Sequence, residues 1–311
     1  MTDSHAPARI TAIVTAHKRV DQTLTTLSVL NACDPPPAEI LVHVDENQVD
    51  CAAAIRAAWP RLRVILSERN LGPGGGRNQL IEAAAYPLIA SFDDDSYPID
   101  VDYFARVGAL FAKFPEASLL CARLFHLNEQ LEPAAMTAEW VADFVGCACV
   151  YRRERLQDTG GYVPLPLAYG MEEVDLALRL HAKGHRVLYT PWLRVFHDTD
   201  RGRHADSRVT AASIANTALL AYLRYPASLW AVGVWQCLNR VRWLVQNGRR
   251  DGIAAGLASI PSQLRKYRTH RDRVSASAVR SYLALRRRSV PLGLDLDRCQ
   301  REVLALTVAR Q

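Results

Sequence analysis

Short apolar runs alternate with amphipathic stretches over the first two hundred residues of the chain. We expect strands at 10–16, 39–44, 62–66, 87–92 and 118–124. We expect a helix after Asp21 that runs through Leu24, Leu27 and Leu30, and further helices at 49–59, 77–85 and 101–114. Asp21 predicts the N-cap of the first helix, and the proline run at 35–37 would end it. This alternation is typical of a mostly parallel sheet flanked by helices, so we expect an α/β fold.

The pattern becomes mixed beyond residue 124 and then purely helical. We expect a strand over 141–151, a helix over 172–183 and a strand over 186–189 that Pro191 ends. After residue 205 strand patterns stop, and helices are expected at 213–223, 227–246, 253–267 and 275–288. The chain therefore divides into an α/β domain over 1–205 and a helical C-terminal extension over 206–311.

Composition places the chain among globular proteins. Apolar residues make up 49% of its 311 positions, which suffices for a sizeable core. The first residues lack the features of a signal peptide, and the seven cysteines have no framework spacing, so we expect a cytoplasmic protein with reduced thiols. Cys147 and Cys149 are expected on one face of a strand, and a metal site built from sulfur is not favoured.

Charge is unevenly distributed along the chain. Residues 236–311 hold 16 Lys and Arg against 5 Asp and Glu, whereas residues 1–235 hold 22 against 27. The apolar stretch at 227–238 is too short to span a bilayer and predicts a core helix or a membrane-surface helix. A basic helical region favours contact with anionic membranes or other polyanions, and its apolar residues alternatively predict packing against the first domain or a second copy.

Three consecutive carboxylates, Asp93, Asp94 and Asp95, follow the apolar strand at 87–92. The carboxyl end of such a strand lies at the ligand crevice of an open α/β sheet. Adjacent carboxylates repel one another unless a cation or hydrogen-bond donors lie among them, and carboxylates with substrate phosphates are the usual ligands of Mg²⁺. The triplet therefore predicts a divalent metal site; the alternative is a solvated acidic turn.

Two further motifs carry candidate chemistry. The glycine-rich stretch 70–76, followed by Arg77, fits neither a Walker loop nor a dinucleotide fingerprint, so it predicts either a backbone that approaches a phosphate or a flexible connection. Glu172 and Glu173 begin a helix, where a carboxylate could act as general base or could simply stabilise the helix end. Four residues apart on that helix, Asp175 and Arg179 are expected to pair.

His197 follows a short apolar run and could complete the coordination of a metal held by carboxylates. Taken in order, these motifs resemble the family-2 glycosyltransferases of the GT-A fold. The resemblance covers residues 10–200: the opening strand through Arg19, the second strand into Asp45, the glycine stretch from Asn70, the Asp-X-Asp motif, the segments 146–153 and 160–162, the Glu172-Glu173 pair, and the late His197.

The resemblance implies an inverting, metal-dependent transferase acting on a nucleoside-diphosphate sugar, UDP- or dTDP-linked rather than GDP-linked. It implies Mg²⁺ or Mn²⁺ on Asp93, Asp95 and His197, a catalytic base at Glu173 with Glu172 beside it, and donor contacts at Thr15, His17, Arg19, Asp45, Asn70, Gly72, Arg77, Asp93 and Asp94. The acceptor would be a glycan, a lipid-linked group or another hydroxyl compound, and no nucleic acid. Glu173 stands where the family usually has Asp.

Two other functions share parts of this pattern. A sugar-phosphate nucleotidyltransferase would use the same sheet and acids, but it needs a glycine-rich basic loop after the first strand, where this chain has His17, Lys18 and Arg19. A non-catalytic nucleotide-sugar-binding module should lack one of the metal acids or the base, and all are present here.

Overall fold

The computed structural model describes residues 8–199 and 206–292. Their strands are β1 (Ile10–Ala16), β2 (Glu39–Val44), β3 (Arg63–Leu66), β4 (Leu88–Asp93), β5 (Ser96–Pro98), β6 (Ala117–His126), β7 (Ala138–Val141), β8 (Cys149–Arg152), β9 (Arg186–His197) and β10 (Val290–Leu292). They form one sheet in the order β10-β7-β9-β6-β8-β4-β1-β2-β3, and β5 pairs with β9. Strands β1 to β4 pair in parallel, as do β6 and β9.

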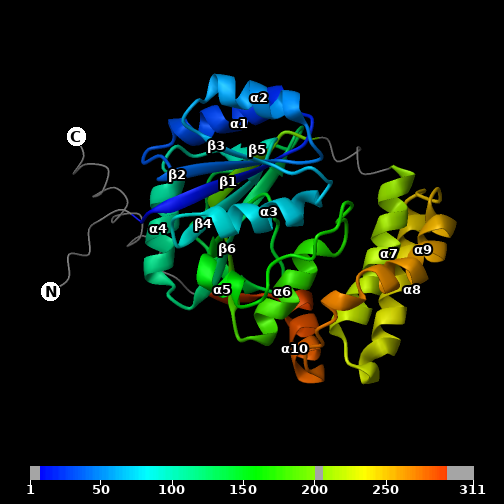
Figure 1. Cartoon of the computed structure of the whole chain (residues 1–311). Helices are drawn as coiled ribbons and strands as arrows, with labels where there is room; N and C mark the ends of the chain where they lie inside the picture. The colour runs from blue at the N-terminus through cyan, green and yellow to red at the C-terminus, as the bar shows by residue number, and fades with distance from the viewer. Residues whose placement is uncertain (1–7, 200–205, 293–311) are drawn as a thin grey trace.

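The described helices lie on both faces of the sheet and beside it. They are α1 (Val20–Ala32), α2 (Val49–Ala58), α3 (Gly72–Ala83), α4 (Tyr103–Lys113), α5 (Arg153–Gln157), α6 (Glu172–Ala182), α7 (Ser207–Arg224), α8 (Trp230–Gln246), α9 (Ile253–Lys266) and α10 (Ala276–Arg287), with short 3₁₀ helices at Ala227–Leu229 and Arg268–His270. Figure 1 shows α1 and α2 on one side of the sheet and α3, α5 and α6 on the other. The predicted α/β fold with a helical C-terminal region is confirmed.

The central strand β1 shows why these residues form a sheet with two covered faces. Ile10, Ala12 and Val14 pack into the core under α1, α2 and α4, whereas Ile13 packs into the core with α3 and α6. A strand buried on both faces must be apolar nearly throughout, which is typical of parallel sheets. This is why five of its seven residues are apolar and no strict alternation with polar residues appears; the two exceptions are Thr11 and Thr15.

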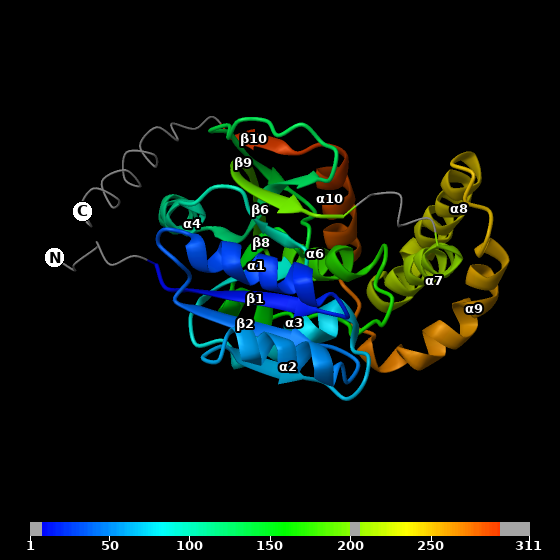
Figure 2. The same cartoon turned by 90° about the horizontal axis from the view of Figure 1, so that it is seen from above.

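The helices after residue 205 form a group beside the sheet and then return to it. Helix α7 packs against both α8 and α9, and α10 packs against α6. Figure 2 shows α10 and β10 back at the sheet, away from α8 and α9. The prediction that no strand follows residue 205 is wrong, because β10 pairs antiparallel with β7. Such a three-residue edge strand is formed by its partner and leaves no pattern in its own sequence.

A buried ion cluster joins α6 to α7. The predicted pair of Asp175 and Arg179 is confirmed, with a distance of 2.6 Å, and Arg224 of α7 binds the same carboxylate at 2.5 Å. All three side chains are buried. Because the Asp175 carboxylate faces two guanidinium groups, its charge is compensated in the low-dielectric interior, and the cluster holds the C-terminal helices to the first domain.

Strand predictions in the second half of the sheet were only partly correct. The expected single strand at 141–151 is two strands, β7 and β8, because β7 pairs with β9 whereas β8 pairs with β4 and β6. Pro191 does not end its strand: β9 continues to His197, and the register against β6 shifts from Thr190 to Arg194. Proline is tolerated at such an irregularity because no ladder hydrogen bond from its nitrogen is required there.

The glycine-rich stretch 70–76 is not a loop. Helix α3 starts at Gly72, within the glycines, rather than at Arg77 as predicted. Gly72 has φ +67°, and a Cβ there would lie 1.9 Å from the carbonyl oxygen of Leu165; a Cβ on Gly76 would lie 2.5 Å from Nδ1 of His43. Neighbouring chain therefore fills the space of these side chains, and glycine is required for close packing. Asp21 is likewise not a side-chain cap, because α1 begins at Val20 and Asp21 lies in its first turn.

Replacing Gly76 with Ala is expected to lower the free energy of unfolding by about 1–3 kcal/mol. The new methyl group would press on the buried His43 ring across a helix–strand contact. Urea unfolding of the purified protein measures the change. The matched control is Glu82→Ala on the exposed side of the same helix, which should change stability by less than about 0.5 kcal/mol. Equal stability of the Gly76 variant and the parent would contradict this packing.

Over the described ranges, no helix combines the length and the apolar composition that crossing a membrane requires.

Candidate active site

A pocket of about 890 Å³ opens at the carboxyl ends of β1, β2 and β4. Parallel strands end at one edge of the sheet, and loops that leave in different directions there create a crevice. Every residue predicted for the site except Asp95 lines this pocket: Thr15, His17, Arg19, Asp45, Asn70, Gly72, Arg77, Asp93, Asp94, Glu172, Glu173 and His197. Motifs separated by more than 180 residues in the sequence therefore meet in one cavity.

The acidic triplet is not a solvated turn. Asp94 and Asp95 are each only 1% exposed, and both bind the guanidinium of Arg19, whose Nε lies 3.1 Å from Asp94. Burial raises the pKa of Asp94 to about 7 despite the charge of Arg19. Burial also disfavours ionised Asp95, but His197 and Arg19 outweigh it and hold the pKa of Asp95 below its usual value. Arg19 thus compensates the two buried carboxylates.

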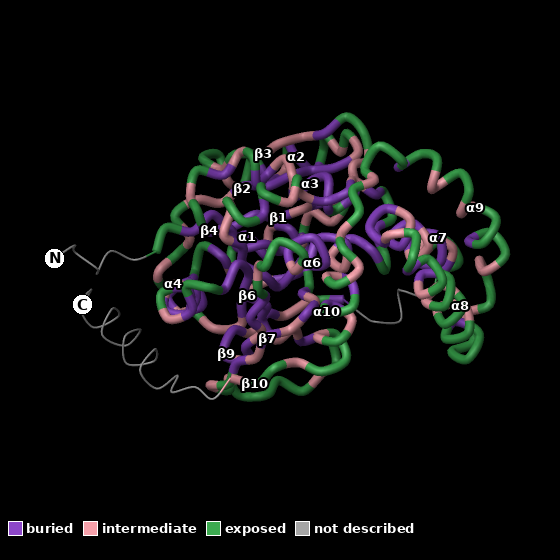
Figure 3. The backbone as a smooth tube through the Cα atoms, turned by 90° about the horizontal axis from the view of Figure 1, so that it is seen from below, coloured by how far each residue is buried: buried purple, intermediate pink, exposed green. Residues whose placement is uncertain are grey.

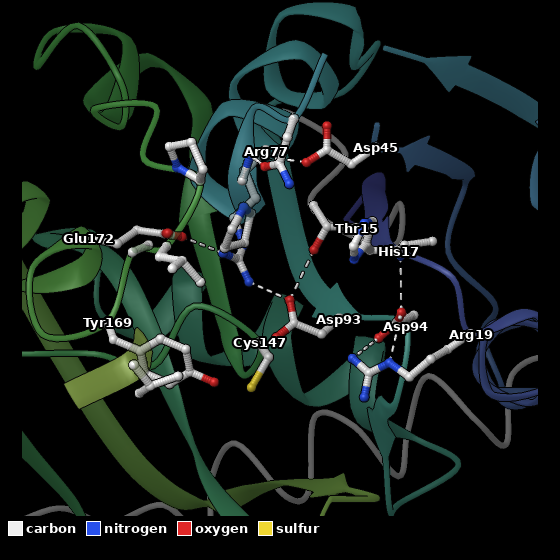
Figure 4. A pocket seen from close by; sticks show the side chains of 18 of the residues that line it. Thr15, His17, Arg19, Asp45, Arg77, Asp93, Asp94, Cys147, Tyr169 and Glu172 are labelled. Carbon is white, nitrogen blue, oxygen red and sulfur yellow. Dashed lines mark hydrogen bonds and ion pairs between the residues drawn. The ribbon is translucent and has the colours of Figure 1, made fainter. Parts of the chain in front are cut away.

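The third carboxylate, Asp93, faces the pocket and is held from two sides. The hydroxyl of Thr15 donates to it at 2.9 Å, and Arg77 donates to it at 2.5 Å (Figure 4). Arg77 is 2% exposed, and its other nitrogens donate to Ser91 at 3.1 Å and to Glu172 at 2.5 Å. Arg77 therefore pairs with carboxylates from two different motifs. This arginine fixes the Asp-X-Asp strand against the start of α6.

Three possible metal ligands gather beside the triplet. Ligand atoms of Asp93, Cys147 and His197 all lie within 4.8 Å of one another. Nε2 of His197 lies 3.1 Å from Oδ1 of Asp95, and its Nδ1 is buried without a hydrogen-bond partner among the described residues. Carboxylate oxygens with one imidazole suit Mg²⁺ or Mn²⁺, so the donor set fits the implied ion. The Cys147 thiol adds a softer ligand that the sequence prediction set aside.

Glu172 and Glu173 have different surroundings although they are adjacent. Glu172 is buried against Arg77, and burial raises its pKa to about 8. Glu173 is half-buried, and its Oε1 accepts a hydrogen bond from the Gly146 amide at 3.3 Å. Burial raises the pKa of Glu173 as well, and Arg77 opposes the increase. Glu173 is therefore the more accessible carboxylate for a proton from a pocket-bound hydroxyl.

At the edge of the pocket Asp45 stabilises the start of α3. Its carboxylate accepts hydrogen bonds from the amides of Leu71 and Gly72, both at 3.0 Å, and from the Ser67 hydroxyl at 2.7 Å. These amides begin α3, where backbone donors otherwise lack partners. Asp45, which follows β2, thus caps the N-terminus of α3. Its contact with the donor stays a prediction.

Several pocket residues were not predicted. Tyr169 lies in a connection without periodicity, and Cys147, expected inside a strand, lies before β8 and points into the pocket (Figure 4). Glu46, which pairs with His17 at 2.7 Å, is the second residue after β2. His126 ends β6 two residues beyond the expected strand, and its ring packs on that of His197 with centroids 5.4 Å apart. The expectation that Cys147 shares a strand face with Cys149 is wrong, because Cys147 precedes β8. His126 would have been placed at the site only if the strand had been predicted to continue two residues further.

Residues 11–160 match the family model described as glycosyl transferase family 2. Over this stretch the chain is similar to glycosyl transferase family 2. Among curated relatives, the succinoglycan biosynthesis protein ExoO of Rhizobium meliloti (strain 1021) is 36% identical over 88 residues, which are 28% of this chain and 25% of ExoO. The uncharacterized protein y4gI of Sinorhizobium fredii is 22% identical over 192 residues, or 21% of its length. The chain thus matches about a quarter or less of each relative.

Solved glycosyltransferase structures show the same GT-A fold as this chain. GalNAc-T7 with UDP, GalNAc and Mn²⁺ aligns with a TM-score of 0.56 at 14% identity, over 71% of this chain and 48% of that one. The mannosyltransferase PcManGT from Pyrobaculum calidifontis, in complex with GDP-Man and Mn²⁺, aligns with a TM-score of 0.52 at 14% identity, over 98% of this chain and 89% of that one. Because the identity is so low, these similarities establish the fold alone.

Proposed function

We propose that this family 2 protein transfers a sugar, with inversion, from a nucleoside-diphosphate sugar to an acceptor hydroxyl. The observation that carries the proposal is the meeting of two motifs in one pocket: the acidic triplet after β4 and the carboxylates at the start of α6, joined by Arg77. The family match to residues 11–160 supports the same conclusion.

In this reaction Glu173 accepts the proton of the acceptor hydroxyl. The freed oxygen forms a bond to the anomeric carbon while the bond from that carbon to the diphosphate oxygen breaks, and a single displacement of this kind inverts the anomeric configuration. Asp93, Asp95 and His197 would hold Mg²⁺ or Mn²⁺, with Cys147 close by. When bound, the ion supplies Lewis-acid stabilisation of the leaving diphosphate. Arg77 and Thr15 hold Asp93 in place for this task.

We further propose that Thr15, His17, Arg19, Asp45, Asn70 and Gly72 form the nucleotide side of the pocket, with a UDP- or dTDP-linked donor ahead of a GDP-linked one. GalNAc-T7 holds UDP and PcManGT holds GDP-Man, each with Mn²⁺, so both nucleotide classes occur on this fold. The acceptor would be a glycan, a lipid-linked group or another hydroxyl compound, and the protein would work in the cytoplasm or at the inner face of the membrane.

Donor binding by the purified protein tests the proposal. With Mn²⁺ present, thermal shift and slow donor hydrolysis are measured for a panel of UDP-, dTDP- and GDP-linked sugars. We expect one nucleotide class to raise the melting temperature and to be hydrolysed, and chelation of the ion to abolish both effects. Failure of every sugar nucleotide to bind or to be hydrolysed would contradict the proposal.

The rate of sugar transfer is expected to increase with pH, in a pH range above the one in which carboxylates ordinarily titrate. Glu173 can accept a proton only when ionised, and burial raises its pKa above the usual value of about 4.3. The acid limb of kcat should therefore lie above about pH 4.3 and level off once Glu173 is ionised. Its measurement needs saturating donor and metal at each pH. The limb should persist in Glu172→Gln; a limb at the ordinary carboxylate pKa would contradict the assignment.

A further inference from the structure

Helix α8 has an exposed apolar face on the side turned away from α7. Its members recur at helical spacing and are widely exposed: Trp230 (45%), Val234 (60%), Trp235 (61%), Leu238 (57%) and Val245 (40%). The opposite side of the helix packs closely on α7, since a Cβ on Gly233 would lie 2.4 Å from the Cβ of Ala221. In Figure 3 the α8 and α9 segment is largely exposed, whereas the central strands such as β1 and β6 are mostly buried.

A surface helix normally presents polar residues to water, so this arrangement needs a partner. We name these five residues the α8 face. The Arg271 guanidinium lies 5.6 Å from the centroid of the Trp230 ring, and each of the five side chains still remains at least 40% exposed. The α8 face cannot belong to a spanning helix, because no helix in the described ranges is long and apolar enough. A helix that is apolar on its open side, carries tryptophans and is too short to span is suited to lie in the plane of a membrane surface.

The charge of this region indicates whether the α8 face binds a lipid surface or a second copy of the chain. Residues 225–271 contain eight Lys and Arg and a single acid, Asp251. Arg242 is exposed on α8 itself, Arg250 is exposed just beyond its end, and the Arg240 guanidinium lies 4.9 Å from the centroid of the Trp243 ring. A symmetric dimer through the α8 face would bring two copies of this basic region together, and juxtaposed like charges are unfavourable. Anionic lipid headgroups complement them.

We propose that the α8 face docks this protein on an anionic lipid surface, with α8 parallel to the membrane plane. The tryptophans and aliphatic side chains enter the boundary between headgroups and acyl chains, and the arginines contact lipid phosphates. Because α8 packs on α7, and the first turn of α7 contributes Arg208 and Val209 to the pocket, docking also orients the catalytic domain relative to the membrane. The docking itself does not depend on the proposed transferase activity.

Vesicle flotation of the full chain tests this proposal. Vesicles of phosphatidylcholine alone are compared with vesicles that also contain phosphatidylglycerol, at low and at high salt. The protein should float with the anionic vesicles at low salt, and binding should weaken at high salt because screening shortens the reach of the arginines. A triple variant, Val234→Ser with Trp235→Ser and Leu238→Ser, should reduce partitioning at least about tenfold, because the apolar area that enters the membrane is lost.

Matched variants separate docking from general effects of surface change. Leu127→Ser with Leu131→Ser removes exposed apolar residues from the connection after β6 and should float like the parent. Arg242→Glu with Arg250→Glu should abolish the preference for anionic vesicles. Urea unfolding confirms that each variant is folded. Light scattering without vesicles reports the oligomeric state.

Two results would overturn the proposal. One is the absence of anionic flotation, or flotation that the triple variant retains. The other is a dimer of the parent that the triple variant dissociates, which would assign the α8 face to a second copy of the chain.

Discussion

Replacing Glu173 with Gln is expected to lower the rate of sugar transfer by about 10²–10⁴-fold while donor affinity is kept. Glutamine preserves the size of the side chain and the oxygen that accepts from the Gly146 amide at 3.3 Å, so the start of α6 should stay in place. Only the ability to take up a proton is lost. Steady-state kinetics at saturating donor and metal, together with donor titration of the variant, measure both parts of this prediction.

The matched control is Glu172→Gln at the neighbouring position. Glu172 is buried and paired with Arg77 at 2.5 Å, so replacing its carboxyl group with an amide should weaken the hold on Arg77 and reduce stability. Its effect on kcat should be smaller than that of the Glu173 variant, and the acid limb of the rate–pH profile should remain. If Glu172→Gln is the inactive protein and Glu173→Gln is nearly normal, the base has been assigned to the wrong residue of the pair.

The fold was predictable where a single local pattern dictates an element. Strands such as β1 and helices such as α4 are bounded by turn residues and have strong apolar patterns, and their predicted limits lie within two residues of the observed ones. The errors have non-local causes. The positions in α3 are glycine, although glycine disfavours helix, because His43 and Leu165 leave no room for side chains, and β10 is a strand because β7 pairs with it. Neither partner can be identified from the segment itself.

The site was predictable for a related reason. Asp93 and Asp45 follow apolar strands, and carboxyl ends of parallel strands meet at one edge, so strand order alone brings them together. Residues on irregular connections carry no such information, which explains why Tyr169 was missed. Cys147 was expected inside a strand, and its place before β8 depends on where the pairing of β8 with β4 and β6 begins. The sequence also could not show that Arg19 neutralises Asp94 and Asp95, since that contact depends on how the chain turns after β1.

Asp95 is the residue of the triplet through which the metal prediction can be tested most directly. It lies 3.1 Å from Nε2 of His197 and is held from the other side by Arg19. Asp93 is less suitable, because it also fixes Arg77 and Thr15, and its loss would disturb the base side of the pocket. In Asp95→Asn, Arg19 stays anchored by Asp94, to which its Nε donates at 3.1 Å.

Asp95→Asn is expected to weaken Mn²⁺ binding and to lower metal-dependent transfer by about 10²–10³-fold, the usual effect of removing one electrostatic stabiliser of a developing charge. Calorimetric titration with Mn²⁺, with and without nucleoside diphosphate, measures the binding part independently of activity. The control is Asp100→Asn, which removes a carboxylate paired with Arg194 and Arg106 outside the pocket and should reduce stability without changing metal affinity. Unchanged Mn²⁺ affinity in Asp95→Asn would remove Asp95 from the metal site and leave Asp93, Cys147 and His197 as the candidate ligands.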